Sequence, residues 1–168
     1  PPPASAVLRA VRDAMVVFGA EIEARFGAGT VKSIVAGLKS MGRVCAKTLE
    51  WFQGDYRRIT DLARMTFECR TLAALLEVLR ALAADPRFEI FLINDRLMPE
   101  YNAGERGGYR DMFVNVVHKD TGHVGEIQLN LTPLLKVKNH GSGGHVAYEL
   151  ARMLGLFKRS IAEHNGLL

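Results

Sequence analysis

Cysteine, long apolar runs and repeats are all scarce in this sequence. Two cysteines among 168 residues are too few for a disulfide framework, and their spacing does not match a zinc site. The longest apolar stretches, residues 14–20 and 90–93, are too short to cross a bilayer. Residues 1–5 read Pro-Pro-Pro-Ala-Ser, which lacks the basic and apolar regions of a secretory signal and predicts the remnant of a linker or an excision point. These absences exclude a membrane protein, a disulfide-stapled mini-protein, a repeat solenoid and a coiled coil.

What the chain does contain is typical of one globular domain. Hydrophobic residues make up 48% and charged residues 24% of the sequence, an ordinary balance that supports a buried core. The 22 Lys and Arg against 18 Asp and Glu give a net charge of +4. A mildly basic surface permits a phosphate-bearing ligand without identifying one.

Hydrophobic periodicity predicts a chain that mixes helices and strands. The predicted helices cover residues 6–26, 32–43, 72–84 and 144–164, and the predicted strands cover residues 59–69, 88–94, 109–118 and 123–131. Residues 44–52 continue the second helix or form another turn, and residues 136–144 form a basic, glycine-rich connection. Because a helix joins the first two strands, we expect them to be parallel, whereas the last two strands form a hairpin. The fold class is therefore α+β (α/β), with a mixed sheet of about four to five strands flanked by helices.

Polar residues stand out on and beside the last two predicted strands. Glu126, Gln128 and Asn130 alternate with apolar neighbours, so they share one side of their strand. That side is either a solvated face or the floor of a cleft. Two glycines precede Tyr109, where the backbone can approach a ligand closely and the ring can stack on a flat base. The alternative is a packed tyrosine at a flexible hairpin entry.

Basic residues gather in the first half of the chain, close to one carboxylate. Asp61 follows the pair Arg57-Arg58, so it is either part of a surface ion pair or a metal ligand beside a phosphate site. Further basic residues at helical spacing form either a solvated face or a clamp for polyphosphate. They are Lys32, Lys39, Arg43 and Lys47.

The predicted final helix brings several polar side chains to one side. They are His145, Tyr148, Glu149 and Arg152, and they form a surface network or part of a site. His145 and Glu149 do not make the H-E-x-x-H zinc motif. The sequence contains no Walker P-loop, nucleophile elbow or dinucleotide-binding fingerprint.

Five short motifs follow one another along most of the chain. They are Lys32-Ser33, Ile59-Thr60-Asp61-Leu62, Gly107-Gly108-Tyr109, Gly125-Glu126-Ile127-Gln128-Leu129 and His145-Val146-Ala147-Tyr148. In this order and at these spacings they resemble the synthetase domain of the RelA/SpoT alarmone enzymes. The resemblance implies the RelA/SpoT synthetase (nucleotidyltransferase-like) fold for residues 31–168. Residues 1–30 would add an N-terminal helix to the same compact domain.

The resemblance also implies a reaction, in which ATP donates its β,γ-pyrophosphate to the 3′-hydroxyl of an acceptor purine nucleotide. By that likeness Asp61 and Glu126 are catalytic and hold Mg²⁺, Glu126 alternatively activates the acceptor hydroxyl, and Tyr109 stacks on the acceptor base. Two carboxylates from different strands, with cations nearby, suit Mg²⁺ and in-line phosphoryl-type transfer. The implied substrate-binding residues are Tyr109, Lys32, Ser33, Lys39, Arg43, Arg57, Arg58, Arg64, Arg106, Gln128, Asn130, His145 and Tyr148.

The sequence departs from the family pattern around the expected phosphate and base contacts. Arg64 stands where glycine is usual, and Thr66 stands where arginine is usual. Phe113 replaces a histidine and Asn130 an arginine, and residues 104–106 read Gly-Glu-Arg in place of Pro-Lys-x. The likeness is therefore to a divergent, toxin-like branch that acts on adenosine or guanosine nucleotides.

We expect an antibacterial effector domain, excised from a larger secreted protein, that acts in the bacterial cytoplasm of a target cell. An immunity protein is then an expected partner, beside ATP and the acceptor nucleotide, and no membrane contact is expected. The alternatives are pyrophosphorylation of a tRNA 3′ end and a catalytically silent nucleotide-binding module. A net charge of only +4 argues against a large RNA partner.

Overall fold

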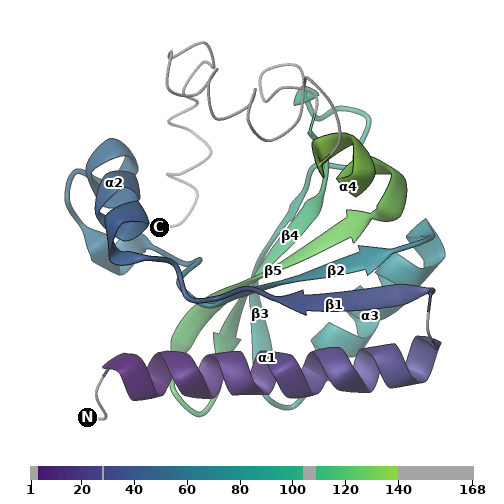
Figure 1. Ribbon diagram of the computed structural model, residues 1–168, viewed down its shortest axis with the longest axis horizontal. Coiled ribbons are helices and arrows are strands. Elements are labelled where there is room, and N and C mark those ends of the chain that lie inside the picture. Colours follow the sequence, from purple (N-terminus) through teal and green to yellow (C-terminus); the bar gives the residue numbers. More distant parts are fainter. Residues whose placement is uncertain (1–3, 28, 104–108, 140–168) are drawn as a thin grey trace.

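The computed structural model describes residues 4–27, 29–103 and 109–139. Within these residues the helices are α1 (Ala4–Phe26), α2 (Met41–Phe52), the 3₁₀ turn η1 (Tyr56–Arg58), α3 (Leu72–Ala84) and α4 (Thr132–Asn139). The strands are β1 (Val31–Val35), β2 (Arg64–Cys69), β3 (Phe88–Asp95), β4 (Met112–His118) and β5 (His123–Leu131). They form one sheet in the order β1-β2-β5-β4-β3. Helices α1 and α3 lie on one side of this sheet, and α2 and α4 lie at its opposite ends (Figure 1).

The sheet is mixed, as predicted. Strands β2 and β5 pair in parallel, and the other three pairs are antiparallel. Strands β2 and β3 therefore run in the same direction, although β5 and β4 separate them, which confirms the relation expected from the helix that joins them. The β4–β5 hairpin is also confirmed, with His118 opposite His123.

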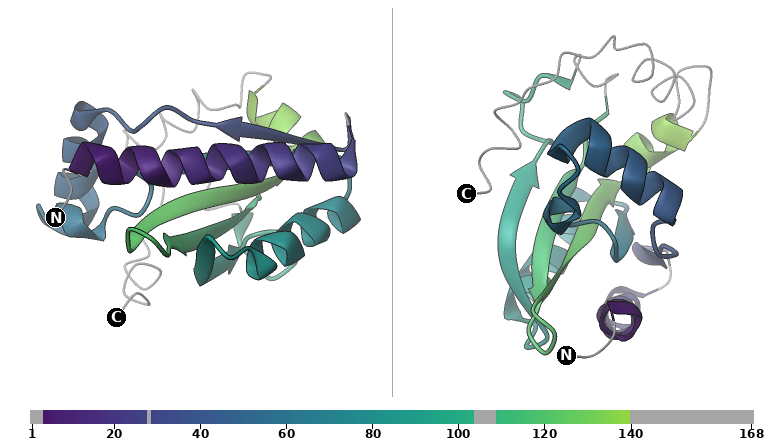
Figure 2. Two further views of the ribbon diagram at one scale, coloured as in Figure 1. Left: turned by 90° about the horizontal axis from the view of Figure 1, so that it is seen from below. Right: turned by 90° about the vertical axis from the view of Figure 1, so that its left-hand side faces the viewer.

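The core lies between the sheet and the two helices α1 and α3. Alternation along β5 sends Ile127 and Leu129 into this core, and it sends Glu126 and Gln128 to the opposite side of the sheet. Helix α1 runs along the sheet (Figure 2) and packs closely because Gly125 has no side chain. A β-carbon at Gly125 would lie 2.5 Å from the Cε of Met15 on α1. No helix among the described residues is long and apolar enough to span a membrane.

The predicted helix over residues 32–43 is wrong. Val31–Val35 forms an edge strand that pairs antiparallel with β2, and the helix begins at Met41. The lysines have helical spacing. Val31, Ser33 and Val35, however, also alternate with period two, and they lie on the side of the sheet that α1 covers. The sheet buries this alternating set, so tertiary packing overrides the helical pattern.

Two predicted strands begin earlier in the sequence than in the structure. Strand β2 starts at Arg64 rather than at residue 59, because Asp55 caps η1 through its side chain and directs the chain into a turn first. Strand β4 starts at Met112 rather than at residue 109. Helix α4 takes up part of the predicted basic connection, with proline in its first turn. The predicted helix over residues 144–164 lies outside the described residues.

An ion-paired arginine fastens α1 to the turn before β3. Arg87 Nε donates to Asp85 Oδ1 at 2.9 Å, a second nitrogen pairs with Glu21 of α1, and Asp85 is only 8% exposed. We expect Arg87→Ala to lower the free energy of unfolding by about 3 kcal/mol, because it leaves the Asp85 carboxylate buried and unpaired. Glu21→Ala removes an exposed partner and should cost less than about 1 kcal/mol. Urea denaturation compares the two variants, and equal losses would contradict this account.

Candidate active site

The face of the sheet opposite the core carries polar side chains in rows. Residues paired across strands point to the same side, so the strand register defines three rows. The first row contains Asn115, Glu126 and Arg64, the second Phe113, Gln128 and Thr66, and the third Asn130, Glu68 and Lys32. Glu126 and Asn130 are four residues apart on β5, which places the outer rows about 13 Å apart at roughly 3.3 Å per residue. We call this surface the polar face.

Asp61 lies between two lysines at the first row's end of the polar face. Lys47, on α2, places its Nζ 3.1 Å from Asp61 Oδ2, and Lys39, just before α2, donates a hydrogen bond to the same oxygen. Asp61 is 7% exposed, and its Oδ1 is buried without a hydrogen-bond partner among the described residues. One carboxylate oxygen is therefore held by ammonium groups, and the other is a buried acceptor that no described residue satisfies.

These contacts correct one of the two interpretations of Asp61. Arg57 pairs with Asp55 through Nε and Oδ1 at 2.9 Å rather than with Asp61. The cations that hold Asp61 come instead from α2 and the segment before it. Asp61 also precedes β2 by three residues instead of beginning the strand.

Glu126 lies beside Asp61 with a different protonation behaviour. Its Oε1 accepts a hydrogen bond from Gln128 Nε2 at 2.7 Å. Burial raises the pKa of Glu126, and the charge of Asp61 raises it further against the opposing effects of Gln128 and Lys47. Burial alone would also raise the pKa of Asp61, but Lys47 and Lys39 outweigh burial and hold that pKa below its usual value. The two environments therefore shift the pKa values of these carboxyl groups in opposite directions. Asp61 stays ionised, while Glu126 can exchange a proton.

These two carboxyl groups fit a magnesium ion bound together with phosphate. Mg²⁺ prefers one or two carboxylates and keeps its remaining positions for water and phosphate oxygens. The unpartnered Asp61 Oδ1 and the neighbouring Glu126 supply such a set. The described residues contain no group of three or more side chains able to hold a metal, so a nucleotide would have to complete the shell.

Tyr109 lies at the third row's end of the polar face, together with Asn130. Its hydroxyl donates to Asn130 Oδ1 at 2.7 Å. Burial raises the pKa of the Tyr109 phenol, and the nearby Asp111 carboxylate adds to this effect, so the hydroxyl remains protonated. The Arg96 guanidinium lies 5.8 Å from the centre of the Tyr109 ring. This end of the face is therefore aromatic and hydrogen-bonded, whereas the other end holds the carboxylates and lysines.

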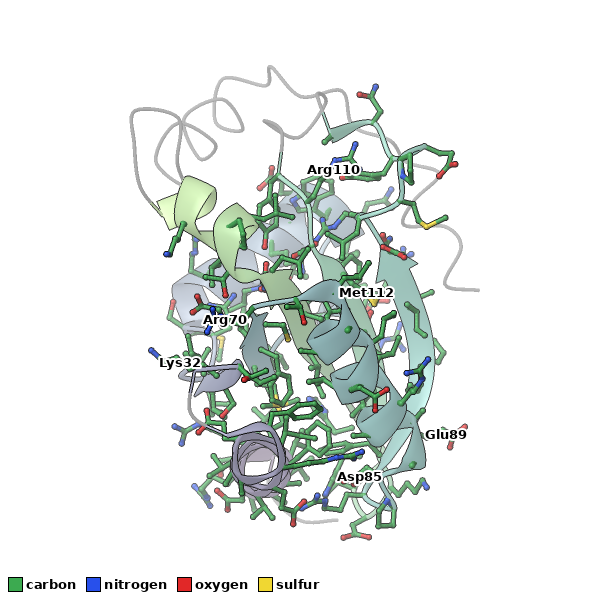
Figure 3. The ribbon with its side chains drawn as sticks, turned by 90° about the vertical axis from the view of Figure 1, so that its right-hand side faces the viewer. Lys32, Arg70, Asp85, Glu89, Arg110 and Met112 are labelled. Atoms are coloured by element: carbon green, nitrogen blue, oxygen red, sulfur yellow. The ribbon has the colours of Figure 1, made fainter. Side chains whose placement is uncertain are left out.

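The structure brings Asp61, Glu126, Lys39, Arg64 and Gln128 together at or beside the first row. It does not place all predicted residues there. Lys32 projects from the exposed strand β1 in the third row (Figure 3). Ser33 faces α1 on the opposite side of the sheet, where a β-carbon at Gly19 would lie 2.7 Å from its Oγ.

The other predicted basic residues lie farther out. Arg43 is exposed on α2, and Arg57 and Arg58 are exposed on η1, where Arg58 lies 5.4 Å from the centre of the Phe52 ring. Three predicted residues lie outside the described ones: Arg106, His145 and Tyr148.

Sequence reasoning did not select several residues that the structure places at this site. Lys47 stood in the basic run, but its spacing alone could not distinguish it from a solvated lysine. Asn115 interrupts the apolar strand β4, a signal that could have been used, and it is 2% exposed with no partner for its Nδ2 among the described residues. Arg96 and Asp111 are 15 residues apart in the sequence and meet across a loop, so no local sequence pattern indicates their contact.

Comparisons with known proteins identify the fold. No protein-family model and no curated protein matches the sequence. The structure, however, has the fold of the alarmone synthetases, which confirms the predicted fold.

Three solved structures show this similarity. Small alarmone synthetase 2 from Bacillus subtilis matches with a TM-score of 0.66 and 16% identity, over 96% of this chain and 84% of the synthetase. Small alarmone synthetase 1 from the same organism, bound to its product pppGpp, gives 0.63 and 14% identity over 98% of this chain and 86% of its own. The type VI effector Tas1, solved with its immunity protein, gives 0.61 and 21% identity over 88% and 72% of the two chains. At these identities the similarity establishes the fold.

Proposed function

We propose that this domain transfers the β,γ-pyrophosphate of ATP to the 3′-hydroxyl of an acceptor purine nucleotide. The observation that carries this proposal is the order of groups along the polar face. Carboxylates and lysines lie at one end and an aromatic residue at the other, about 13 Å away along β5, which matches a nucleotide lying along the strand. The fold shared with a synthetase bound to its product pppGpp supports the same assignment.

The cations at the first row suit the phosphates of ATP. Lys47 and Lys39 hold Asp61 ionised, and Arg64 lies opposite Glu126 in the register. These groups offset negative charge on the donor and orient it for in-line attack. Mg²⁺ held by Asp61 would neutralise further charge on the transferred phosphate oxygens.

Glu126 takes the proton in the proposed reaction. The acceptor hydroxyl oxygen bonds to the β-phosphorus of ATP. The bond from that phosphorus to the oxygen that bridges the α- and β-phosphates breaks, and AMP leaves with this oxygen. The hydroxyl proton passes to the Glu126 carboxylate. A raised pKa makes Glu126 a stronger base than an ordinary glutamate near neutral pH.

A product assay tests the proposal. Purified protein is incubated with ATP and Mg²⁺ and, in separate reactions, with ADP, AMP, GDP or GTP, and products are resolved by anion exchange and mass. We expect a Mg²⁺-dependent product heavier by one pyrophosphate and an equal amount of AMP. A pyrophosphorylated tRNA 3′ end in place of a free nucleotide would contradict the acceptor class, and nucleotide binding without any product would indicate a silent module.

We propose further that the domain acts as an antibacterial effector in the cytoplasm of a target bacterium, with an immunity protein as its partner. The fold shared with Tas1, an effector solved with its immunity protein, supports this role. Expression in bacteria should arrest growth, and Glu126→Gln should relieve the arrest. Normal growth with the active protein would contradict the effector role and leave the reaction intact.

A further inference from the structure

A buried ion pair lies at the Tyr109 end of the polar face, and the proposed reaction does not use it. Arg96 Nε donates to Asp111 Oδ1 at 2.7 Å, and the Arg96 backbone N donates to the Asp111 carbonyl at 3.0 Å. The two side chains are 15% and 1% exposed. Replacing a buried ion pair with apolar residues is often neutral or stabilising, so stability alone is a weak reason for this pair.

The guanidinium of Arg96 contacts two aromatic rings. Its Cζ lies 4.7 Å from the centre of the Phe113 ring and 5.8 Å from that of Tyr109. A guanidinium over an aromatic face is a favourable and orienting contact, stronger when it is shielded from water. Tyr109 is thus held by Arg96 at its ring and by Asn130 at its hydroxyl.

The backbone around Arg96 is anchored independently of the Asp111 side chain. Arg110 donates to the carbonyl oxygens of Arg96, Met98 and Tyr101 at 3.2, 2.7 and 2.8 Å. The side chain of Asp111 therefore has a narrower task than holding this loop. Its Oδ1 is held by Arg96, and a side-chain hydrogen bond also links Asp111 to Tyr109, whereas its Oδ2 is buried without a partner among the described residues.

We propose that Asp111 is a positioning residue for the acceptor nucleotide. It aligns the Arg96 guanidinium and contacts the Tyr109 side chain directly, and through both contacts it sets the orientation of the Tyr109 ring on which the acceptor base stacks. This inference rests on the proposed function, which assigns the acceptor base to Tyr109.

A thermodynamic cycle on nucleotide binding tests the proposal. Calorimetry measures the affinity of ADP and of GDP, without ATP, for the wild type, Asp111→Asn, Tyr109→Ala and the double variant. We expect Asp111→Asn to weaken the tighter of the two nucleotides about tenfold, and to have no further effect once Tyr109 is alanine. Additive effects would overturn the proposal, because Asp111 would then not act through Tyr109.

Steady-state kinetics gives a second measurement that a general loss of structure would not reproduce. Asp111→Asn should raise KM for the acceptor about tenfold while leaving kcat and KM for ATP within about twofold of the wild type. A fall in kcat or a rise in KM for ATP of similar size would contradict a role confined to the acceptor.

Asp85→Asn is the matched control, because Asp85 also lies in a buried ion pair with an arginine. Asp85 and Arg110 lie at opposite ends of the molecule (Figure 3), so Asp85→Asn should lower stability without changing nucleotide affinity. If Asp111→Asn folds poorly, adding Arg96→Met removes the unpaired charge, and affinity should remain weak. Equal weakening by Asp85→Asn, or recovery of affinity in Asp111→Asn/Arg96→Met, would overturn the proposal.

The failure of this proposal is distinguishable from failure of the proposed function. Non-additive nucleotide binding without pyrophosphate transfer would contradict the function and support the positioning role. Transfer with additive binding effects would support the function and overturn the positioning role. A wild-type protein that binds neither ADP nor GDP would contradict both.

Discussion

Glu126→Gln is expected to lose at least about a hundredfold in kcat and to unfold at a higher temperature than the wild type. The loss follows from removing the group that takes the acceptor proton, since general bases contribute about a hundredfold or more. The gain follows from burial and from the charge of Asp61, which raise the pKa of Glu126 because they make its ionised form costly in the folded protein. Glutamine keeps the shape without the charge.

The stability gained by Glu126→Gln should depend on pH. The folded-state pKa of Glu126 is raised above 4.5, so the stability linked to its protonation is fully present below about pH 4.5 and is lost as pH rises through the folded pKa. The stability advantage of Glu126→Gln should therefore be largest at neutral pH and vanish in acid. Thermal unfolding without Mg²⁺, at several pH values, measures it.

Glu68→Gln is the control for this variant, because Glu68 is a half-buried carboxylate that lies on β2, on the same polar face of the sheet as Glu126. It lies in the third row, away from Asp61, and should not show the hundredfold loss of kcat. Wild-type turnover in Glu126→Gln would remove Glu126 from the mechanism. Lower stability of Glu126→Gln at neutral pH would show that its charge is not costly in the fold.

Local patterns determined several elements well. The strand His123–Leu131 has the predicted bounds, because alternation along nine residues specifies both its faces. Helix Leu72–Ala84 also begins and ends as predicted, since Thr71 caps its start and Pro86 follows its end. The helix predicted over residues 32–43 is wrong where it overlaps β1, because only pairing with β2 buries the alternating residues of Val31–Val35.

The site divides in the same way between local and long-range information. The motif around Glu126 lies on one strand, so its shared face with Gln128 could be predicted. The partners of Asp61 could not, because Lys39 and Lys47 reach it from α2 rather than from its immediate neighbours. The assignment of roles to these residues remains a prediction that the variants test.

The structure explains one departure from the family pattern, the phenylalanine at position 113. Phe113, found where histidine is usual, provides the ring over which Arg96 lies, 4.7 Å from its centre. Asp111 accepts a hydrogen bond from that arginine at 2.7 Å. The replacement and its compensating contacts lie 17 residues apart in sequence (113 minus 96), a separation that leaves no periodic signal.

Asp61→Asn is expected to reduce both activity and stability, the opposite of Glu126→Gln in its effect on folding. Asp61 neutralises two partly buried ammonium groups, those of Lys39 and Lys47. Removing its charge leaves them facing one another, and breaking such a buried pair costs about 3 kcal/mol. We expect kcat to fall at least about a hundredfold, because the phosphates lose the ionised carboxylate that would share a metal ion with them.

The stability effect of Asp61 has a different pH range from that of Glu126. The pKa of Asp61 is lowered from 3.8, so its stabilising charge is present above about pH 4 and is lost as pH falls through the folded pKa. Wild type and Asp61→Asn should therefore differ at neutral pH and converge in strong acid. The double variant Asp61→Asn/Lys39→Met removes one uncompensated ammonium and should recover part of the stability without recovering turnover, as urea denaturation and the product assay can show. Recovery of turnover would mean that Asp61 serves to hold the lysines and not the metal and phosphates.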